Sequence, residues 1–113
     1  MLIPNENLCK ASRAHVNDIG PKGLVQHQSS DGTDTFVRVK KYYQGGHMGE
    51  NIQFGPSNPL KIVRQLLIDN GTTNLGHRKN ILGDGYTRIG VAIGPHKTYG
   101  SMCCQDFSDA AGD

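Results

Sequence analysis

Apolar residues return every three or four positions near the start of the chain, which is the spacing of one face of a helix. This pattern runs through residues 6–20 and stops at Gly20 and Pro21, two residues that end helices. Asn5 or Asn7 is suited to cap the first turn because its side-chain oxygen can accept a backbone N–H bond. We therefore predict a helix over residues 6–20 with one apolar face.

The same spacing returns in residues 57–71, where it is the clearest helical pattern of the chain. Ser57 or Asn58 can cap the start, Pro59 falls in the first turn, and Gly71 comes just past the end. We predict a second helix here.

Alternating apolar positions and short apolar runs, both typical of strands, appear elsewhere. Residues 88–94 and 99–107 predict two strands joined by a turn at 94–97, which makes an antiparallel hairpin, and residues 50–55 are extended. Residues 37–46 fit a short helix or, through their Val-x-Val alternation, a strand, and we favour the helix. Helices followed by a closing hairpin predict an α+β fold.

Length and charge narrow the class of protein. The 113 residues suffice for one domain, which we expect to span residues 1–113. A net charge of +2 with scattered lysines and arginines does not favour a nucleic-acid surface. No apolar run approaches the ~18 residues of a membrane span, and the opening Met-Leu-Ile-Pro lacks the regions of a signal peptide. We expect neither a nucleic-acid partner nor a membrane span.

The cysteines leave the compartment open. Cys9, Cys103 and Cys104 allow at most one internal disulfide, whose pairing the sequence does not fix, and they have no zinc-finger spacing. Neighbours on a strand point to opposite faces, so Cys103 and Cys104 cannot face the same partner. We expect at least one of them to act as a small buried hydrophobic residue.

Two imidazoles and two carboxyls lie at element ends or in glycine-flanked turns, where side chains from distant parts of a chain can meet in one cleft. They are His27, Glu50, Asp69 and His77. Glu50 in particular stands in the sequence Gly-His-Met-Gly-Glu-Asn-Ile, whose glycines let the backbone bend around a carboxylate.

The remaining histidines have simpler interpretations. His15 lies on the first predicted helix, His47 lies beside glycines, and His96 lies in the predicted hairpin turn. Turn geometry and solvent suffice to explain His96.

The motifs GENI and GHRKNIL, followed by IGVAIGPHKTYG and QDF, occur in an order that resembles the CAP superfamily. This superfamily is also called the SCP-like or PR-1-like domain, and the chain is most similar to its short, single-domain bacterial and unicellular eukaryotic members. The resemblance covers about residues 5–107, and the two motifs at this separation are far more specific than either alone.

The resemblance implies a three-layer α/β/α sandwich with a small antiparallel sheet and a central cleft lined by two histidines and two acids. His27 matches the first cleft histidine, Glu50 the first acid and His77 the second histidine. Asp69 falls where the family usually carries a glutamate, so its side chain is one methylene shorter.

The resemblance also bears on size and location. Family members usually carry a further N-terminal helix, so we expect a chain that begins at Met1 to lack the first family helix. Secreted members carry a signal peptide, and we expect an extracellular location by resemblance, although the chain as given opens without such a peptide. We expect a monomer or a weak dimer.

The chemistry of the cleft leaves two alternatives open. Neutral imidazoles and carboxylates are a suitable first shell for Zn²⁺ or another divalent cation, with His27 and His77 as ligands and Glu50 as a further one. The same groups can instead bond one another in a buried polar network that stiffens the cleft.

Two function classes follow. The first, which we favour, is a binding module that holds a divalent cation and recognises a lipid, a sterol or a protein partner, as the resemblance implies. The second is a metal-dependent or His/Glu hydrolase in which Glu50 acts as general base on a bound water. No serine sits in a nucleophile elbow and no cysteine stands beside a cleft histidine, which weakens the enzyme interpretation.

Overall fold

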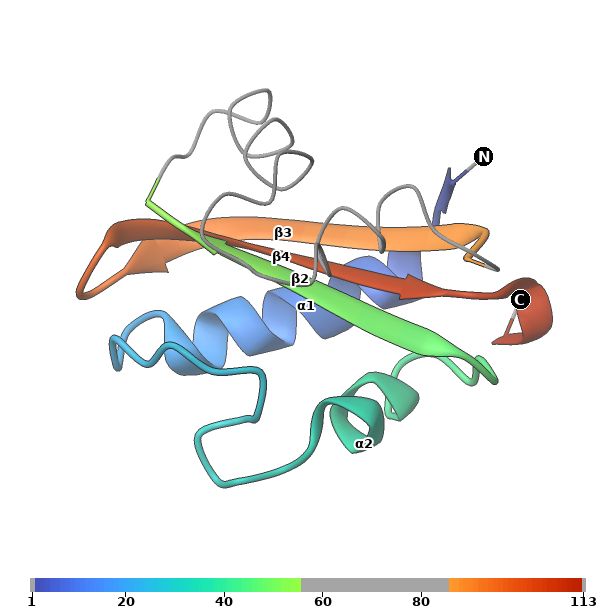
Figure 1. Ribbon diagram of the computed structural model, residues 1–113, viewed down its shortest axis with the longest axis horizontal. Helices are drawn as coiled ribbons and strands as arrows, with labels where there is room; N and C mark the ends of the chain where they lie inside the picture. Colours follow the sequence, from blue (N-terminus) through green and yellow to red (C-terminus); the bar gives the residue numbers. More distant parts are fainter. Residues whose placement is uncertain (1, 56–85, 113) are drawn as a thin grey trace, which may run out of the picture.

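The computed structural model describes residues 2–55 and 86–112, in which two helices cover one face of a four-stranded sheet (Figure 1). In chain order the elements are β1 (Ile3–Pro4), α1 (Glu6–Ile19), α2 (Thr35–Lys40), β2 (Met48–Phe54), β3 (Arg88–His96), β4 (Gly100–Ser108) and a 3-10 turn (Ala110–Gly112). None of the described helices is long and apolar enough to cross a membrane.

The strands lie in the order β1-β3-β4-β2. β2 and β3 both pair antiparallel with β4, whereas the short β1 pairs parallel with β3. The predicted α+β class is therefore confirmed, and the sheet is mixed rather than purely antiparallel because β1 joins its edge. The predicted helix over 57–71 lies outside the described residues, as does the layer it would add to a three-layer sandwich.

Helix α1 forms where the apolar spacing predicted it. The side chain of Asn5 accepts a hydrogen bond of 3.0 Å from the backbone N–H of Leu8, so Asn5 is the N-cap. At the other end the N–H of Gly20 bonds the carbonyl of Val16, and Pro21 follows. The residues it buries return every three or four positions: Leu8, Ala11, Ser12, His15, Val16 and Ile19.

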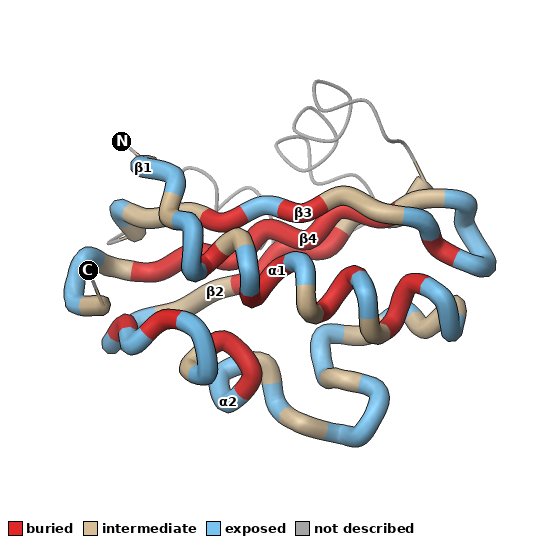
Figure 2. Tube along the Cα trace, turned by 180° about the vertical axis from the view of Figure 1, so that it is seen from behind, coloured by how far each residue is buried: buried red, intermediate tan, exposed pale blue. Residues whose placement is uncertain are grey.

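The apolar core lies between α1 and the sheet, as the band of buried positions along the strands in Figure 2 indicates. One cluster joins α1 to the strands and contains Val16, Ile19, Ile52, Ala92, Met102 and Cys104. A second joins α1 to α2 and contains Leu8, Ala11, Val39 and Tyr43. Burial of each large side chain contributes roughly 1.5–3 kcal/mol, so the first cluster fixes α1 on the sheet and the second fixes α2 beside α1.

Residues 37–40 of the predicted segment 37–46 belong to α2, which begins two residues earlier, and residues 41–46 lie beyond its end; the helical interpretation is thus confirmed over the strand for the first part of the segment. Cys103 and Cys104 alternate along β4, are both buried and form no disulfide. Burial raises the pKa of the Cys103 thiol to about 11, so this thiol stays protonated at neutral pH. The expectation of at least one buried cysteine is therefore confirmed.

The hairpin turn lies further along the chain than predicted. β3 continues through Gly94 and Pro95 to His96, which pairs with Gly100 of β4. Proline is tolerated here because β1 pairs with β3 only as far as Ile89, so the missing N–H breaks no ladder bond to that strand.

The expectation that solvent explains His96 is wrong, because only 3% of this residue is exposed. Its Nδ1 accepts hydrogen bonds from the backbone N–H groups of Thr98 and Tyr99, at 3.2 and 3.1 Å. Its Nε2 must then carry the proton and donate to the carbonyl of Leu24 at 2.8 Å. His96 therefore closes the hairpin turn and ties it to the segment that follows α1.

Gly90 on β3 lets α1 approach the sheet. A Cβ atom at this position would clash with the backbone of Leu8 and Cys9 in the first turns of α1. Unlike a side chain, this backbone cannot move aside without shifting the whole helix.

We predict that Gly90→Ala lowers the free energy of unfolding by about 1–3 kcal/mol, because the added methyl overpacks the contact between β3 and α1. Urea unfolding measures the loss. Gly46→Ala is the matched control, since a Cβ there meets only the carboxylate of Asp109, at 3.4 Å. Equal stability of the two variants would contradict the proposed close approach.

Candidate functional site

The structure brings two of the predicted site residues into contact. His27 lies in the loop after α1, Glu50 lies on β2, and the Nδ1 of His27 is 2.9 Å from the Oε1 of Glu50. The two side chains differ in exposure, at 53% for His27 and 2% for Glu50. The imidazole therefore reaches solvent while its carboxylate partner is fixed in the interior.

Arg38 of α2 holds both of these residues. Its Nη2 donates to the Oε2 of Glu50 at 2.5 Å and to the backbone carbonyl of His27 at 3.3 Å. The hydroxyl of Thr35 also donates to that carbonyl, at 3.2 Å. The position of His27 is thus set through its backbone by α2 and through its ring by β2.

Asp106 of β4 extends the cluster to the centre of the sheet. It stands directly opposite Glu50 in the β2–β4 register, and its Oδ2 lies 3.6 Å from the Nη1 of Arg38. The Ser12 hydroxyl of α1 donates to the same oxygen at 2.9 Å. The Sγ of Cys104 lies 3.5 Å from Glu50 and 3.9 Å from Asp106.

One guanidinium therefore faces two buried carboxyls, and their protonation states differ. Burial alone would raise the pKa of Glu50, but hydrogen bonds from Asp106 and His27 and the charge of Arg38 lower it to about 2. Burial raises the pKa of Asp106, and the neighbouring Glu50 raises it further, well above the usual range. Glu50 is therefore ionised at neutral pH, and Asp106 carries a proton.

The proton of Asp106 is shared with Glu50 in a carboxyl–carboxylate hydrogen bond. Its Oδ2 already accepts from Ser12, whereas its Oδ1 is buried and receives no donor among the described residues. The cluster then holds one positive and one negative charge, which limits the cost of burying it.

His15 fixes the loop that leads to His27. This histidine is fully buried, and its Nε2 lies 3.0 Å from the carbonyl of Gln26. Burial lowers the pKa of His15. A neutral ring whose Nε2 donates to that carbonyl follows from these facts, so His15 holds the residue next to His27 against α1.

The carboxyls of Glu50 and Asp106 and the thiol of Cys104 lie close enough to suggest a metal site, with donor atoms within 4.8 Å of one another. Two facts argue against metal binding by these three residues. Arg38 already supplies a cation to the same carboxyls, and burial raises the pKa of Cys104, which keeps its thiol protonated. This group of residues fits a guanidinium and does not fit a metal ion.

The predicted cleft tetrad is described in part. His27 and Glu50 are in contact, while Asp69 and His77 lie outside the described residues, so the cleft tetrad stays a prediction. The sequence reasoning missed Arg38, Asp106 and Ser12. Strand alternation offered a signal for Asp106, because it lies two residues from the buried Cys104 and so shares its face.

The class of protein follows from its similarity to a known family. The chain matches the model of the cysteine-rich secretory protein family, CAP, over residues 2–107, and it belongs to that family. The uncharacterized protein YkwD of Bacillus subtilis (strain 168) is 33% identical over 106 residues, a match that covers 91% of this chain and 37% of the relative. The chain thus spans well under half the length of this relative.

Two solved structures share the fold. An outer surface protein from Borrelia burgdorferi superposes with a TM-score of 0.79 at 17% identity, covering 96% of this chain and 77% of that one. An extracellular protein containing an SCP domain from Bacillus anthracis str. Ames superposes with a TM-score of 0.77 at 21% identity, covering 96% and 34%. At these identities the likeness concerns the fold.

We predict that Asp106→Asn raises the free energy of unfolding at pH 7. The unfolded chain loses the Asp106 proton near pH 3.8, whereas the folded chain keeps it to higher pH, so stability falls as pH rises above 3.8. Asparagine has nearly the shape of the protonated carboxyl, offers an N–H donor and a carbonyl acceptor, and takes up no proton. In urea unfolding the gain should disappear below about pH 3.8.

Asp18→Asn is the control, because we expect it to change the free energy of unfolding at pH 7 in the opposite direction. Partial burial would raise the pKa of Asp18, but hydrogen bonds from Ser30 and the neighbouring Lys22 lower it from 3.8 to about 2. Its carboxylate therefore stabilises the fold above pH 3.8, and this contribution is lost between pH 3.8 and 2. Asp18→Asn should lower stability at pH 7. A loss of stability in Asp106→Asn as well would contradict a neutral Asp106.

We predict that Glu50→Ala costs about 1–3 kcal/mol of stability, because Asp106 can ionise and replace Glu50 as the partner of Arg38. The double variant Glu50→Ala/Asp106→Asn removes both carboxylates and leaves a buried guanidinium unpaired, so its loss should reach about 3–5 kcal/mol. A double-mutant cycle by chemical denaturation measures this coupling. Strictly additive effects would exclude a carboxyl pair that shares Arg38.

Proposed function

We propose that this CAP-family chain is a binding module without hydrolytic activity, whose cleft holds a divalent cation through His27. The contact between the Nδ1 of His27 and Glu50 carries the proposal. A neutral His27 that donates from Nδ1 keeps the lone pair of Nε2 for a ligand, on a ring that is half exposed. A carboxylate behind a histidine is the usual support for such a metal ligand.

In this arrangement Glu50 orients His27 and does not itself bind the ion. Arg38 occupies one carboxylate oxygen and His27 the other, and both contacts are within hydrogen-bond distance. We propose His77 as the second ligand and Asp69 as the further acid of the cleft, with Zn²⁺ as the ion that best matches imidazole nitrogens.

The hydrolase alternative asks Glu50 to accept a proton from a bound water. A carboxylate whose pKa is lowered to about 2 has little affinity for that proton at neutral pH. Both of its oxygens also accept hydrogen bonds from protein groups. These observations favour binding over catalysis.

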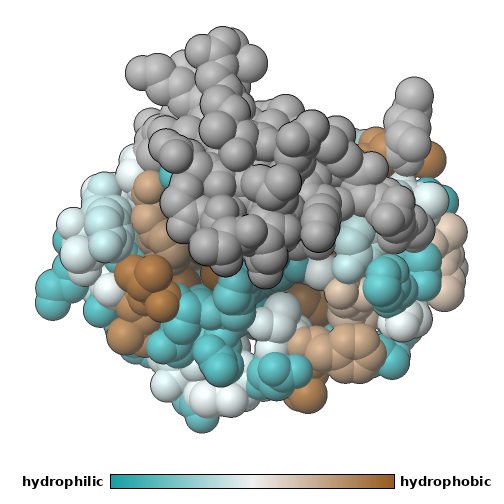
Figure 3. All heavy atoms as spheres, viewed as in Figure 1, coloured by the Kyte–Doolittle hydropathy of each residue, from teal (hydrophilic) through white to brown (hydrophobic). Residues whose placement is uncertain are grey.

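The proposal includes a place outside the cell and a lipid, sterol or protein partner. Names of the solved structures with this fold, an outer surface protein and an extracellular protein, support the location. Exposed apolar side chains suited to such a partner include Phe36 and Val37 of α2. On the face shown in Figure 3, hydrophobic side chains of the described residues form separate patches among hydrophilic ones, which suits contacts with small apolar groups.

The test is thermal melting of metal-stripped protein with added zinc. An ion that binds only the folded state stabilises it by about 2.7 kcal/mol at a concentration about 100 times its dissociation constant. For a domain of this size the midpoint should rise by roughly 10 °C. His27→Ala and His77→Ala should each abolish the rise, measured from their own metal-free midpoints.

His47→Ala is the matched control, because His47 is an exposed histidine that stacks on Tyr86 and is not part of the Glu50 cluster. This variant should keep the full rise. An unchanged wild-type midpoint would assign His27 and Glu50 to a purely structural network. A rise that persists in both alanine variants would show that zinc binds elsewhere.

A further inference from the structure

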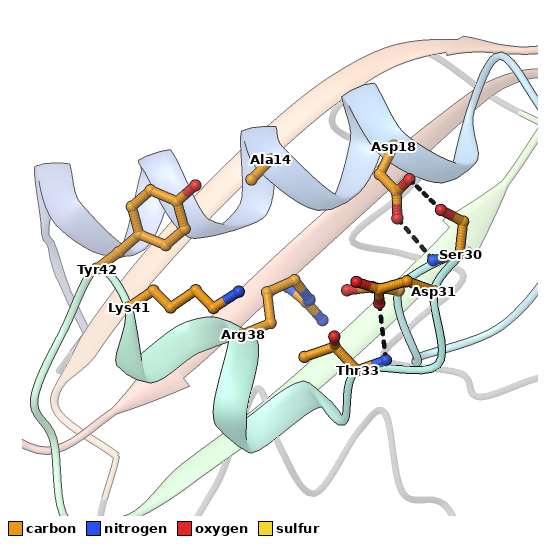
Figure 4. Close-up of a pocket in the computed structure, with 9 residues that line it drawn as sticks. Ala14, Asp18, Ser30, Asp31, Thr33, Arg38, Lys41 and Tyr42 are labelled. Atoms are coloured by element: carbon orange, nitrogen blue, oxygen red, sulfur yellow. Dashed lines mark hydrogen bonds between the residues drawn. The ribbon is translucent and has the colours of Figure 1, made fainter.

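The loop that joins α1 to α2, residues 20–34, is fixed to the rest of the fold at two separate points. The carbonyl of Leu24 accepts a hydrogen bond of 2.8 Å from the Nε2 of His96. The carboxylate of Asp18 accepts from the backbone N–H and the hydroxyl of Ser30, at 2.7 and 2.6 Å, and both bonds are drawn in Figure 4. The stretch 25–28 therefore lies between two fixed points.

This stretch is held by polar contacts more than by apolar burial. Val25, His27 and Gln28 are exposed, and Gln26 is partly buried. The carbonyl of Gln26 accepts a bond of 3.0 Å from the Nε2 of His15, which has no exposed surface. Further bonds run through His27 to β2 and α2. A stretch with so little apolar burial opens at a low cost in free energy.

The ring of His15 can hold a second proton only at a cost while the stretch is docked. Its Nδ1 is buried and has no hydrogen-bond partner among the described residues, so a proton there would add a charged N–H without an acceptor. Burial lowers the pKa of His15, and the charge of Arg38 lowers it further. Glu50, Asp18 and the bond to Gln26 act in the opposite direction without outweighing burial.

The charged groups that act on this ring keep their charges in mild acid. They are Arg38 of α2, Glu50 of β2 and Asp18 of α1. The pKa values of Glu50 and Asp18 are both lowered to about 2, and that of Arg38 is raised above its usual value. Asp106 of β4 is protonated and stays neutral. Within this set, His15 is the group that changes charge between about pH 7 and pH 4.

We propose that His15 makes this loop a pH-sensitive switch, in which one proton taken from solvent by its Nδ1 releases the stretch 25–28 from α1 and separates the ring of His27 from Glu50. Water reaches a released ring, which then binds the proton near pH 6.5, the ordinary value for histidine. The inference does not depend on zinc or on the proposed function.

The direction of the pH effect follows from the protons that each form binds. Above about pH 6.5 the docked and released forms of His15 carry the same charge, so pH does not favour either. Below it the released form alone gains a proton, and its population rises by up to about tenfold for each pH unit. The rise ends at the lowered pKa of the docked ring.

The experiment follows the isotope-labelled full chain by NMR from about pH 7.5 to pH 4.5, without added metal. Relaxation dispersion of the backbone amides of residues 25–28 gives the population of the released form, which should rise about tenfold from pH 6 to pH 5. The ring nitrogen and carbon shifts of His15 report its protonation, and they should change over the same pH range as the amides. This ring measurement needs no substitution.

The variant His15→Gln separates the effect of this ring from that of the other histidines. A glutamine N–H can donate to the same carbonyl of Gln26, and the side chain takes up no proton. The released population should then change by less than about twofold between pH 6 and pH 5. The control His47→Gln removes an exposed histidine outside the loop and should keep the full rise. Effects of protons on His27 or His96 are common to all three proteins and cancel in the comparison.

Four results would overturn the inference. The first is protonation of His15 near pH 6.5 while residues 25–28 stay docked. The second is an unchanged stretch and a neutral ring down to about pH 4.5. The third is a full rise in His15→Gln, which would assign the effect to another group. The fourth is loss of the rise in His47→Gln.

Discussion

A single buried guanidinium connects the helices to the sheet in this protein. Arg38 comes from α2, contacts Glu50 on β2 and Asp106 on β4, and donates to the backbone of the loop at His27. Burial of a cation is costly unless its partners are buried with it and hydrogen-bonded. Because the partners lie on adjacent strands, the cation can be satisfied only when α2, the loop and both strands are in place. The interaction therefore selects this one arrangement.

The same constraint shapes the chemistry of the site. Glu50 is kept ionised by Arg38 and by the proton on Asp106, and it in turn orients the half-exposed ring of His27. A carboxylate held this firmly is a poor base and a good support for a neighbouring histidine. The side chain that the sequence marked for chemistry thus contributes mainly by fixing the position of His27, whose ring is half exposed.

Hydrophobic spacing and capping residues predicted the helices and strands well wherever an element is stabilised mainly by residues close to it in the sequence. The helical spacing and asparagine cap of α1 and the alternation in β4 depend on neighbouring residues, so they could be read from the chain. The end of β3 was harder to place, because Pro95 and His96 look like turn residues by themselves. Their place in the strand depends on the end of the β1–β3 pairing at Ile89, before Pro95, and on the bond from His96 to Leu24.

The sequence by itself determined the α+β class, the family resemblance and the candidates His27 and Glu50, because these depend on periodicity and on short motifs. Only the tertiary structure decided that Arg38 and Asp106 complete the cluster, since they come from segments far apart in the chain and their contact depends on the pairing of β2 with β4 and the packing of α2. It also decided that one of the two carboxyls, Glu50, is ionised and the other, Asp106, is protonated. The protonation of these two side chains depends on burial and on neighbours in space, and neither can be read from the sequence.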